Sequence, residues 1–146
     1  MPDPSPGGVP DPVVGVGSRR EERERALALL YEAEAKGISP AEAVAAQPVP
    51  LDGYALDVVL GVGEQRADLD ARISRLAHNW TLERMPTLDK VVLRMAGFEL
   101  GQRPDVPTGV ILNEAVELAK RYSTDDSGRF VNGLLAKLVG ELRDPA

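Results

Sequence analysis

Residues 105–138 read DVPTGVILNEAVELAKRYSTDDSGRFVNGLLAKL, and this stretch determines the predicted fold. Its first half repeats apolar residues at i, i+3 and i+4 behind Pro107, which presets φ for a first helical turn. Residues 123–126 offer side-chain oxygens to free backbone N–H groups at the start of a second helix, whose apolar stripe begins at Phe130. The pattern predicts two amphipathic helices joined by a tight polar turn.

Three segments of this hairpin carry a more specific pattern than periodicity alone. They read LNEAVELAK at 112–120, STDDS at 123–127 and FVNGLL at 130–135. Together they resemble the NusB family, whose members pair with ribosomal protein NusE and bind boxA RNA in transcription antitermination. The resemblance covers about residues 18–142, although residues 38–60 match poorly. It implies a compact bundle of about seven helices in two packed helical subdomains.

The composition limits the classes of function. The chain has 146 residues, enough for one domain with a sizeable core, and it contains no cysteine and one histidine. No disulfide, thiolate nucleophile or cofactor is therefore expected. No apolar run approaches the ~20 residues of a membrane span, and the N-terminus lacks a signal-peptide layout, so we expect a cytoplasmic protein. Because the net charge is −6, RNA binding requires a local basic patch.

The chain divides into a tail and one domain. Residues 1–17 hold five prolines and four glycines without apolar periodicity, which predicts a disordered tail. The capping box SRRE at 18–21 predicts that the first helix begins there and stops at Gly37. A second capping box, SPAE at 39–42, predicts a short helix. Residues 18–146 are expected to form a single domain.

Three more helical segments are expected before the hairpin. Residues 52–77 carry a helical stripe, residues 80–85 suggest a short turn of helix, and residues 88–101 a further helix. Gly61 and Gly63 lower helix propensity in the first of these, which suggests that another helix approaches closely there. Nothing alternates with period two for long enough to make a strand. The predicted fold is all-α.

The arginines of the first helix allow two interpretations. Interleaved glutamates favour a solvated face of i,i+3 and i,i+4 ion pairs. Alternatively, Arg19 and Arg23 prolong the apolar stripe beyond the core, where the planar arginine fork suits phosphates and base edges. The family resemblance implies RNA contacts for Arg19, Arg20 and Arg23, but the glutamates depart from the more basic family pattern.

Further RNA contacts are predicted around the hairpin turn. Lys120, Arg121 and Arg129 flank the turn and can add contacts to phosphate. Ser127 and Phe130, which lie in the matching segments, complete the predicted RNA-binding set.

The predicted partner-binding residues are Tyr31, Asp89 and Asp126. On its own, Tyr31 fits core packing with its hydroxyl at the rim, and Asp89 fits a first-turn carboxylate favoured by the helix dipole. The resemblance instead places Tyr31 and Asp89 on the surface that receives NusE. Asp126 stands in the turn, where its carboxylate would oppose the phosphates of a passing RNA.

Catalysis is not expected. The densest acidic group, Glu114, Glu117, Asp125 and Asp126, lacks an accompanying nucleophile, phosphate loop or histidine. We expect a factor that binds boxA RNA and NusE and acts with the RNA polymerase antitermination complex. One rival is an RNA-targeting domain like that fused to ribosomal RNA cytosine methyltransferases, but such an enzyme needs a catalytic cysteine. Another is a protein-only interaction module, possibly a homodimer.

Overall fold

The computed structural model of the protein describes residues 12–78 and 80–143, with side chains from residue 19 onward. No strand occurs in these ranges, which confirms the all-α class. The helical elements in chain order are α1 (Pro12–Lys36), α2 (Pro40–Ala45), α3 (Gly53–Leu76), the 3₁₀ helix η1 (Leu82–Arg84), α4 (Thr87–Gln102), α5 (Thr108–Tyr122) and α6 (Asp125–Leu142).

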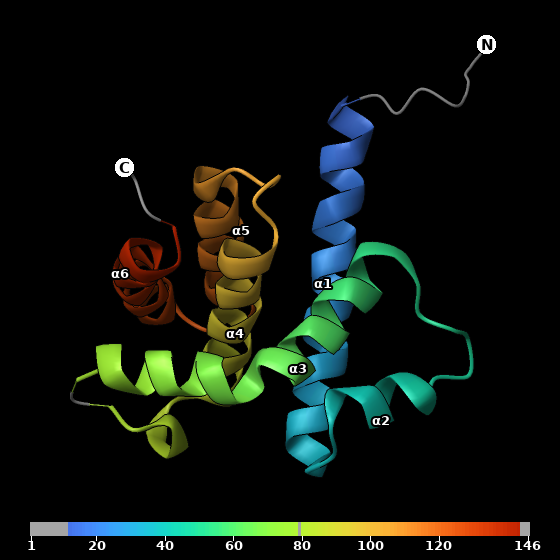
Figure 1. The fold of residues 1–146 in the computed structure, drawn as a ribbon, viewed down its shortest axis with the longest axis horizontal. Helices are drawn as coiled ribbons and strands as arrows, with labels where there is room; N and C mark the ends of the chain where they lie inside the picture. Colours follow the sequence, from blue (N-terminus) through green and yellow to red (C-terminus); the bar gives the residue numbers. More distant parts are fainter. Residues whose placement is uncertain (1–11, 79, 144–146) are drawn as a thin grey trace.

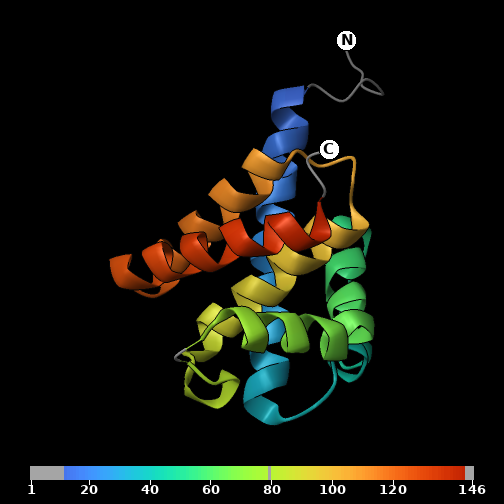
Figure 2. The same cartoon turned by 60° about the vertical axis from the view of Figure 1, so that its left-hand side comes forward.

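The helices pack around α4. Figure 1 shows α4 and α5 side by side with α1 next to them, while α3 crosses one end of this layer and α2 lies beyond it. Seen from the side, α6 crosses α4 and α5 (Figure 2). The N-terminal end of α1 rises above the other helices in both views (Figures 1 and 2).

The predicted count of seven helices in two subdomains is slightly wrong. Residues 80–85 form only the three-residue η1, so the described chain has six α-helices. Residues 91–100 of α4 are all buried, because α4 contacts α1 and α3 on one side and α5 and α6 on the other. The apolar side chains of all these helices form a single core, and therefore the two halves are not separate units.

The first helix begins earlier than predicted. The structure starts α1 at Pro12, six residues before the capping box at Ser18. Proline is well suited to a first helical position because its φ is fixed and its missing N–H has no helical partner there. Residues 12–17, which were predicted to be disordered, are thus helical. Residues 1–11 of the predicted tail lie outside the described part of the chain.

The other capping predictions agree with the structure. The Ser39 N–H donates to the Glu42 carboxylate at 2.8 Å, and the Glu42 N–H donates to Ser39 Oγ at 3.0 Å. At the start of α6 the Ser127 N–H donates to Thr124 Oγ1 at 3.0 Å, which identifies Thr124 as the cap among residues 123–126. These short-range bonds were predictable because both partners lie within one turn.

The close approach of helices at Gly61 is also confirmed. A Cβ atom at Gly61 would lie 2.0 Å from the Phe98 ring, so only glycine permits this α3–α4 contact. None of the helices in the described ranges has the length and apolar character needed to span a membrane.

Candidate nucleic-acid interface and partner groove

The arginines at the start of α1 lie at different depths. Arg23 is only 3% exposed, and its Nε and Nη2 donate to the Glu99 carboxylate at 3.0 and 2.7 Å. The Tyr54 hydroxyl donates to the same carboxylate at 2.5 Å. The prediction that Arg23 prolongs an exposed stripe is therefore wrong. Its partner comes from α4, 76 residues away, and no pattern within α1 reveals it.

The charges in this buried cluster support one another. Burial lowers the pKa of Arg23, but the hydrogen bonds and the charge of Glu99 outweigh it and raise this pKa above its ordinary value. Burial raises the pKa of the Tyr54 phenol, and the neighbouring Glu99 carboxylate raises it further. The arginine thus stays charged and the phenol stays a donor. Arg23 fastens α1 to α4 and is not accessible to an RNA phosphate.

Arg19 and Arg20 reach the surface. Arg20 donates from Nε and Nη2 to the two carboxylate oxygens of Glu114 at 3.1 and 2.7 Å, yet half of its side chain is exposed. These bonds raise the pKa of Arg20. The guanidinium of Arg19 lies 4.1 Å from the centre of the Tyr54 ring, and its Nη2 lies 3.9 Å from Asp105. Both arginines are accessible, but each has an intramolecular partner with which RNA must compete.

Two predicted contact residues are buried between α4 and α6. Asp89 is 2% exposed and Ser127 is 6% exposed, and Ser127 Oγ lies 3.1 Å from Asp89 Oδ2, to which it donates. Burial raises the pKa of Asp89, and the bond from Ser127 offsets this only in part. The predicted positions of Asp89 on the partner surface and of Ser127 on the RNA surface are therefore wrong. Both side chains join α4 to the start of α6.

Lys120 and Arg129 form the exposed basic part of the hairpin. They line one hollow on α5 and α6, and Arg129 is the more exposed, with 73% of its side chain accessible. Arg129 pairs with Asp126, which lies one turn earlier and is even more exposed. The stem of Lys120 packs over Gly128, where an added Cβ would lie 2.5 Å from Lys120 Cγ. The glycine thus allows Lys120 to lie flat against α6.

Phe130 lies beside this basic hollow. It is half-buried, and its ring centre is 6.1 Å from that of Trp80, whose side chain is about half exposed. Phe130 is therefore accessible, as its predicted contact role requires. Trp80 was predicted only as part of a short helical turn, and its position beside α6 was not foreseen.

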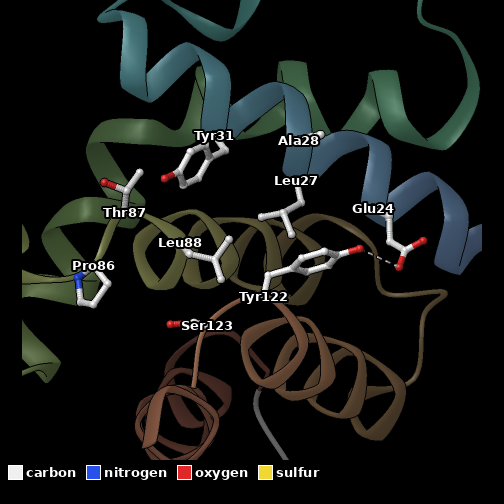
Figure 3. A pocket seen from close by; sticks show the side chains of 9 residues that line it. All are labelled: Glu24, Leu27, Ala28, Tyr31, Pro86, Thr87, Leu88, Tyr122 and Ser123. Atoms are coloured by element: carbon white, nitrogen blue, oxygen red, sulfur yellow. Dashed lines mark hydrogen bonds between the residues drawn. The ribbon is translucent and has the colours of Figure 1, made fainter. Parts of the chain in front are cut away.

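Tyr31 lines an open groove between α1, α4 and the end of α5. The groove has a volume of about 630 Å³. Figure 3 shows Tyr31, Leu88 and Tyr122 directed into it, with Leu27 at its base. Tyr31 is 44% exposed, so nearly half of its surface is free for a partner. An open groove with several apolar side chains and aromatic rings is typical of a protein-binding surface.

Glu24 organises one rim of the groove. It pairs with Arg121 and accepts a hydrogen bond from the Tyr122 hydroxyl at 3.3 Å (Figure 3). Arg121, a predicted RNA contact, is thus held at the groove. Tyr122 is 52% exposed, because it closes the last turn of α5 beyond the core.

The three predicted partner residues do not lie together. Tyr31 faces the groove, and Asp89 is buried next to the groove residue Leu88. Asp126 lies on the exposed face of α6 with Arg129. The hairpin therefore has a basic face on α5 and α6, and the groove lies on another side of the turn.

The sequence model of the NusB family matches residues 20–139, which spans the chain from the arginines of α1 to the last turn of α6. This chain belongs to the NusB family. The match includes every predicted site residue except Arg19.

Individual NusB proteins support this assignment. A transcription antitermination protein NusB from Sorangium cellulosum is 46% identical over 133 residues, which cover 87% of this chain and 95% of the relative. A T. maritima NusB structure shares 32% identity with a TM-score of 0.75 and covers 84% and 91% of the two chains. A crystal structure of antitermination factors NusB and NusE with dsRNA has 23% identity and a TM-score of 0.72, covering 84% and 96%, and shows the same fold.

Within this NusB fold, the residues that sequence reasoning missed are those with distant partners. Leu88 and Tyr122 were assigned to helix stripes, but they line the groove at the ends of their helices. Trp80 meets Phe130 across 50 positions of sequence. The one feature of the sequence that distinguishes Trp80 is that it is the single tryptophan of the chain.

Proposed function

We propose that this NusB-family transcription antitermination factor binds boxA-type RNA of ribosomal RNA leaders together with ribosomal protein NusE. It acts in the cytoplasm as a binding factor without catalytic activity and helps RNA polymerase resist termination. The relatives named transcription antitermination protein NusB support this proposal, as does the solved NusB–NusE–dsRNA assembly of the same fold.

The observation that carries the proposal is the presence of two distinct accessible surfaces, one on the α5–α6 hairpin and one in the groove between α1, α4 and the end of α5. The face of α5 and α6 presents Lys120 and Arg129 around a hollow that also contains Asp125. The groove presents apolar and aromatic side chains and contains Glu24 but no basic residue in its described lining. Phosphate requires cations, whereas a protein anchor requires apolar surface. The two surfaces therefore suit an RNA and a protein partner at the same time.

On the RNA side, the exposed cations contact phosphates. Lys120 and Arg129 supply the strongest contacts, because their only described ion pairs are with exposed carboxylates on the preceding turn. Arg19 and Arg20 are also accessible, but they exchange an existing partner for the RNA. Arg23 takes no part because it is buried.

On the partner side, Tyr31 is the anchor. A tyrosine presents an apolar ring and a polar tip, and such residues carry a large share of binding energy at protein interfaces. Leu88 and Tyr122 line the same groove and add apolar surface to it (Figure 3).

The proposal is tested by titrating boxA-type RNA with this protein at several salt concentrations, with and without NusE. We expect affinity to fall as salt rises, because cations on the protein release counterions from the RNA. NusE should raise the affinity at every salt concentration. Binding that is absent with and without NusE would overturn the proposal.

The groove is tested by Tyr31→Asp, which places a charge where the ring meets the partner. We expect NusE binding to weaken by about 2 kcal/mol or more, measured by calorimetry. Val49→Asp is the matched control, since Val49 is 76% exposed on the loop before α3 and receives the same charge away from the groove. Equal NusE binding by Tyr31→Asp and the unmodified chain would place the interface elsewhere.

A protein-only module or homodimer is the second candidate. It is favoured by the pairing of Arg20 and Arg23 with carboxylates, which leaves less free charge on α1 than the sequence suggests. In that case a second copy of the chain occupies the groove. Sedimentation of the isolated protein then shows a dimer that Tyr31→Asp dissociates, and RNA binding stays weak and nonspecific.

A further inference from the structure

A further hollow lies between the start of α3 and the end of α4. It has a volume of about 490 Å³, and its lining includes Leu56, Leu60 and Phe98. On the α4 side the hollow is lined by Gln102, which is about 20 Å along the helix from Leu88 in the partner groove. This hollow is therefore separate from the groove that contains Tyr31.

Two leucines of α3 line the hollow without taking part in the core. Leu56 and Leu60 are one helical turn apart, and both are only half-buried. In the described part of the chain, neither is among the side chains that form the apolar core or pack against it. The Phe98 ring, which packs over the bare backbone of Gly61, is buried and closes the floor. The two leucines thus offer apolar surface to a side chain from outside.

The rim of the hollow carries negative charge. Residues 52–65 contain three acidic residues and no lysine or arginine. Two of them, Asp57 and Glu64, line the hollow, and both side chains are exposed. They precede and follow Leu60 on α3 and are about 10 Å apart along the helix. The apolar surface is therefore flanked by carboxylates.

The basic residue in the described lining is already paired. Arg103 Nη1 donates to the Asp57 carboxylate at 2.6 Å, and Arg103 Nη2 donates to Asp105 at 3.1 Å. Only 24% of the Arg103 side chain is exposed. Two carboxylates thus offset this one cation, and Glu64 leaves the described lining with a net negative charge.

We propose that this hollow is a docking site for a basic amphipathic helix of another protein. An apolar side chain of that helix lies on Leu56 and Leu60, and its lysine or arginine side chains on the adjacent turns pair with Asp57 and Glu64. The site goes beyond the proposed function, because its occupation requires neither RNA nor NusE. A second copy of this chain is the competing occupant.

A synthetic peptide tests the charge of the rim. The probe is a fluorescein-labelled helix of about 20 residues, made of leucine and lysine at amphipathic spacing. Its anisotropy should saturate with the unmodified chain, and Glu64→Lys should weaken binding about tenfold. Glu83→Lys makes the same charge change on the exposed helix η1 and should leave binding nearly unchanged. Equal losses for the two variants would overturn the proposal, because the peptide would then respond only to net charge.

Leu60→Gln tests the apolar surface. Glutamine and leucine have similar helix propensities, and Leu60 does not pack against the core, so the melting temperature should stay nearly unchanged. We expect the affinity for the peptide to fall about fivefold or more. Val110→Gln is the matched control, because it removes an exposed apolar side chain from α5 and should not affect binding. Unchanged peptide affinity of a folded Leu60→Gln variant would refute the docking site.

A dye attached at the hollow locates the bound peptide. The chain contains no cysteine, so Gln102→Cys provides a single attachment point for acrylodan. We expect unlabelled peptide to shift the emission to shorter wavelength, because the bound helix shields the dye from water. The same dye on Asn113→Cys, at an exposed position of α5 outside the hollow, should show no shift. Equal shifts at both positions would contradict docking in this hollow.

Competition and sedimentation separate the other occupants. Saturating NusE and boxA-type RNA should leave the affinity for the peptide unchanged, because they bind elsewhere. Loss of peptide binding when NusE is added would place the peptide in the partner groove and overturn the proposal, whatever the outcome for RNA. A dimer of the unmodified chain that Leu60→Gln dissociates would assign the hollow to a second copy instead.

Discussion

The start of α1 and the exposed face of α6 differ in how their arginines are paired. Arg23 is buried with Glu99, and Arg20 is held by both oxygens of Glu114. Arg129 also has a carboxylate partner, Asp126, but both side chains are more than two-thirds exposed. A buried pair is expensive to break, whereas an exposed pair contributes little and exchanges readily. Arg20 and Arg23 are therefore harder to release for RNA than Arg129 is.

This difference shows that the number of basic residues in a segment does not tell how many of them are free to contact RNA. The start of α1 is the more basic of the two in sequence, while the turn before α6 carries two adjacent aspartates. In the fold, carboxylates from α4 and α5 neutralise the first region. The second presents its cations around a hollow.

Breaking the buried pair should have the largest effect. Arg23→Ala leaves the Glu99 carboxylate buried with only the Tyr54 hydroxyl as a described side-chain donor, so we expect a loss of about 3–5 kcal/mol in the free energy of unfolding. Urea denaturation of the two chains measures this loss in the free energy of unfolding. Arg129→Ala is the control, and its stability should match that of the unmodified chain. A small loss for Arg23→Ala would show that the pair does not fasten α1 to α4.

The buried carboxylate of Asp89 should make stability depend on pH. Because its pKa is raised in the folded state, folding favours the protonated form, and the stability that this group contributes is lost as pH rises through the folded pKa. Asp89→Asn should therefore be about 1 kcal/mol more stable than the unmodified chain at about pH 7. The advantage should shrink as pH falls through the raised pKa of Asp89, because both chains then carry a neutral group at this position.

Thermal unfolding at several pH values compares these two chains. Ser127→Ala is the complementary variant, since it removes the hydroxyl that donates to Asp89 and should destabilise the protein more at neutral pH than in acid. A pH profile that is identical in the unmodified chain and Asp89→Asn would contradict the assigned burial of this charge.

Asp126→Asn should have the smallest effect on the free energy of unfolding, but it should change RNA affinity measurably. The change removes the carboxylate that pairs with Arg129, while asparagine tolerates the first turn of a helix. We expect unfolding free energy to shift by about 0.5 kcal/mol and RNA affinity to rise by roughly two- to fivefold at low salt. Asp52→Asn, at the exposed start of α3, is the control. Weaker RNA binding by Asp126→Asn would mean that the carboxylate itself accepts a bond from a base.

Local features of the fold were predictable from the sequence. The capping box at residues 39–42, the cap at Thr124 and the close approach at Gly61 all depend on residues within one turn or on the absence of a side chain. The helical hairpin was predictable because its apolar stripe is strong and its turn is polar. The early start of α1 at Pro12 was missed because the capping box six residues later gave a competing signal.

The candidate site was only partly predictable, because tertiary contacts decide accessibility. Tyr31 and Arg129 lie on the surface as expected. Arg23 and Asp89 have the residue types of surface contacts, but α4 brings a carboxylate to the first and the start of α6 covers the second. Their partners are 76 and 38 positions away, so no local pattern could indicate their burial.

The salt dependence of RNA binding tests most directly whether the α5–α6 face, rather than the start of α1, supplies the phosphate contacts. The slope of log affinity against log salt concentration is measured for the unmodified chain, Arg129→Ala and Arg20→Ala. We expect Arg129→Ala to reduce the slope by about one and Arg20→Ala to reduce it by clearly less, because Arg20 is already held by Glu114. A reduction for Arg20→Ala that equals or exceeds that for Arg129→Ala would contradict this account.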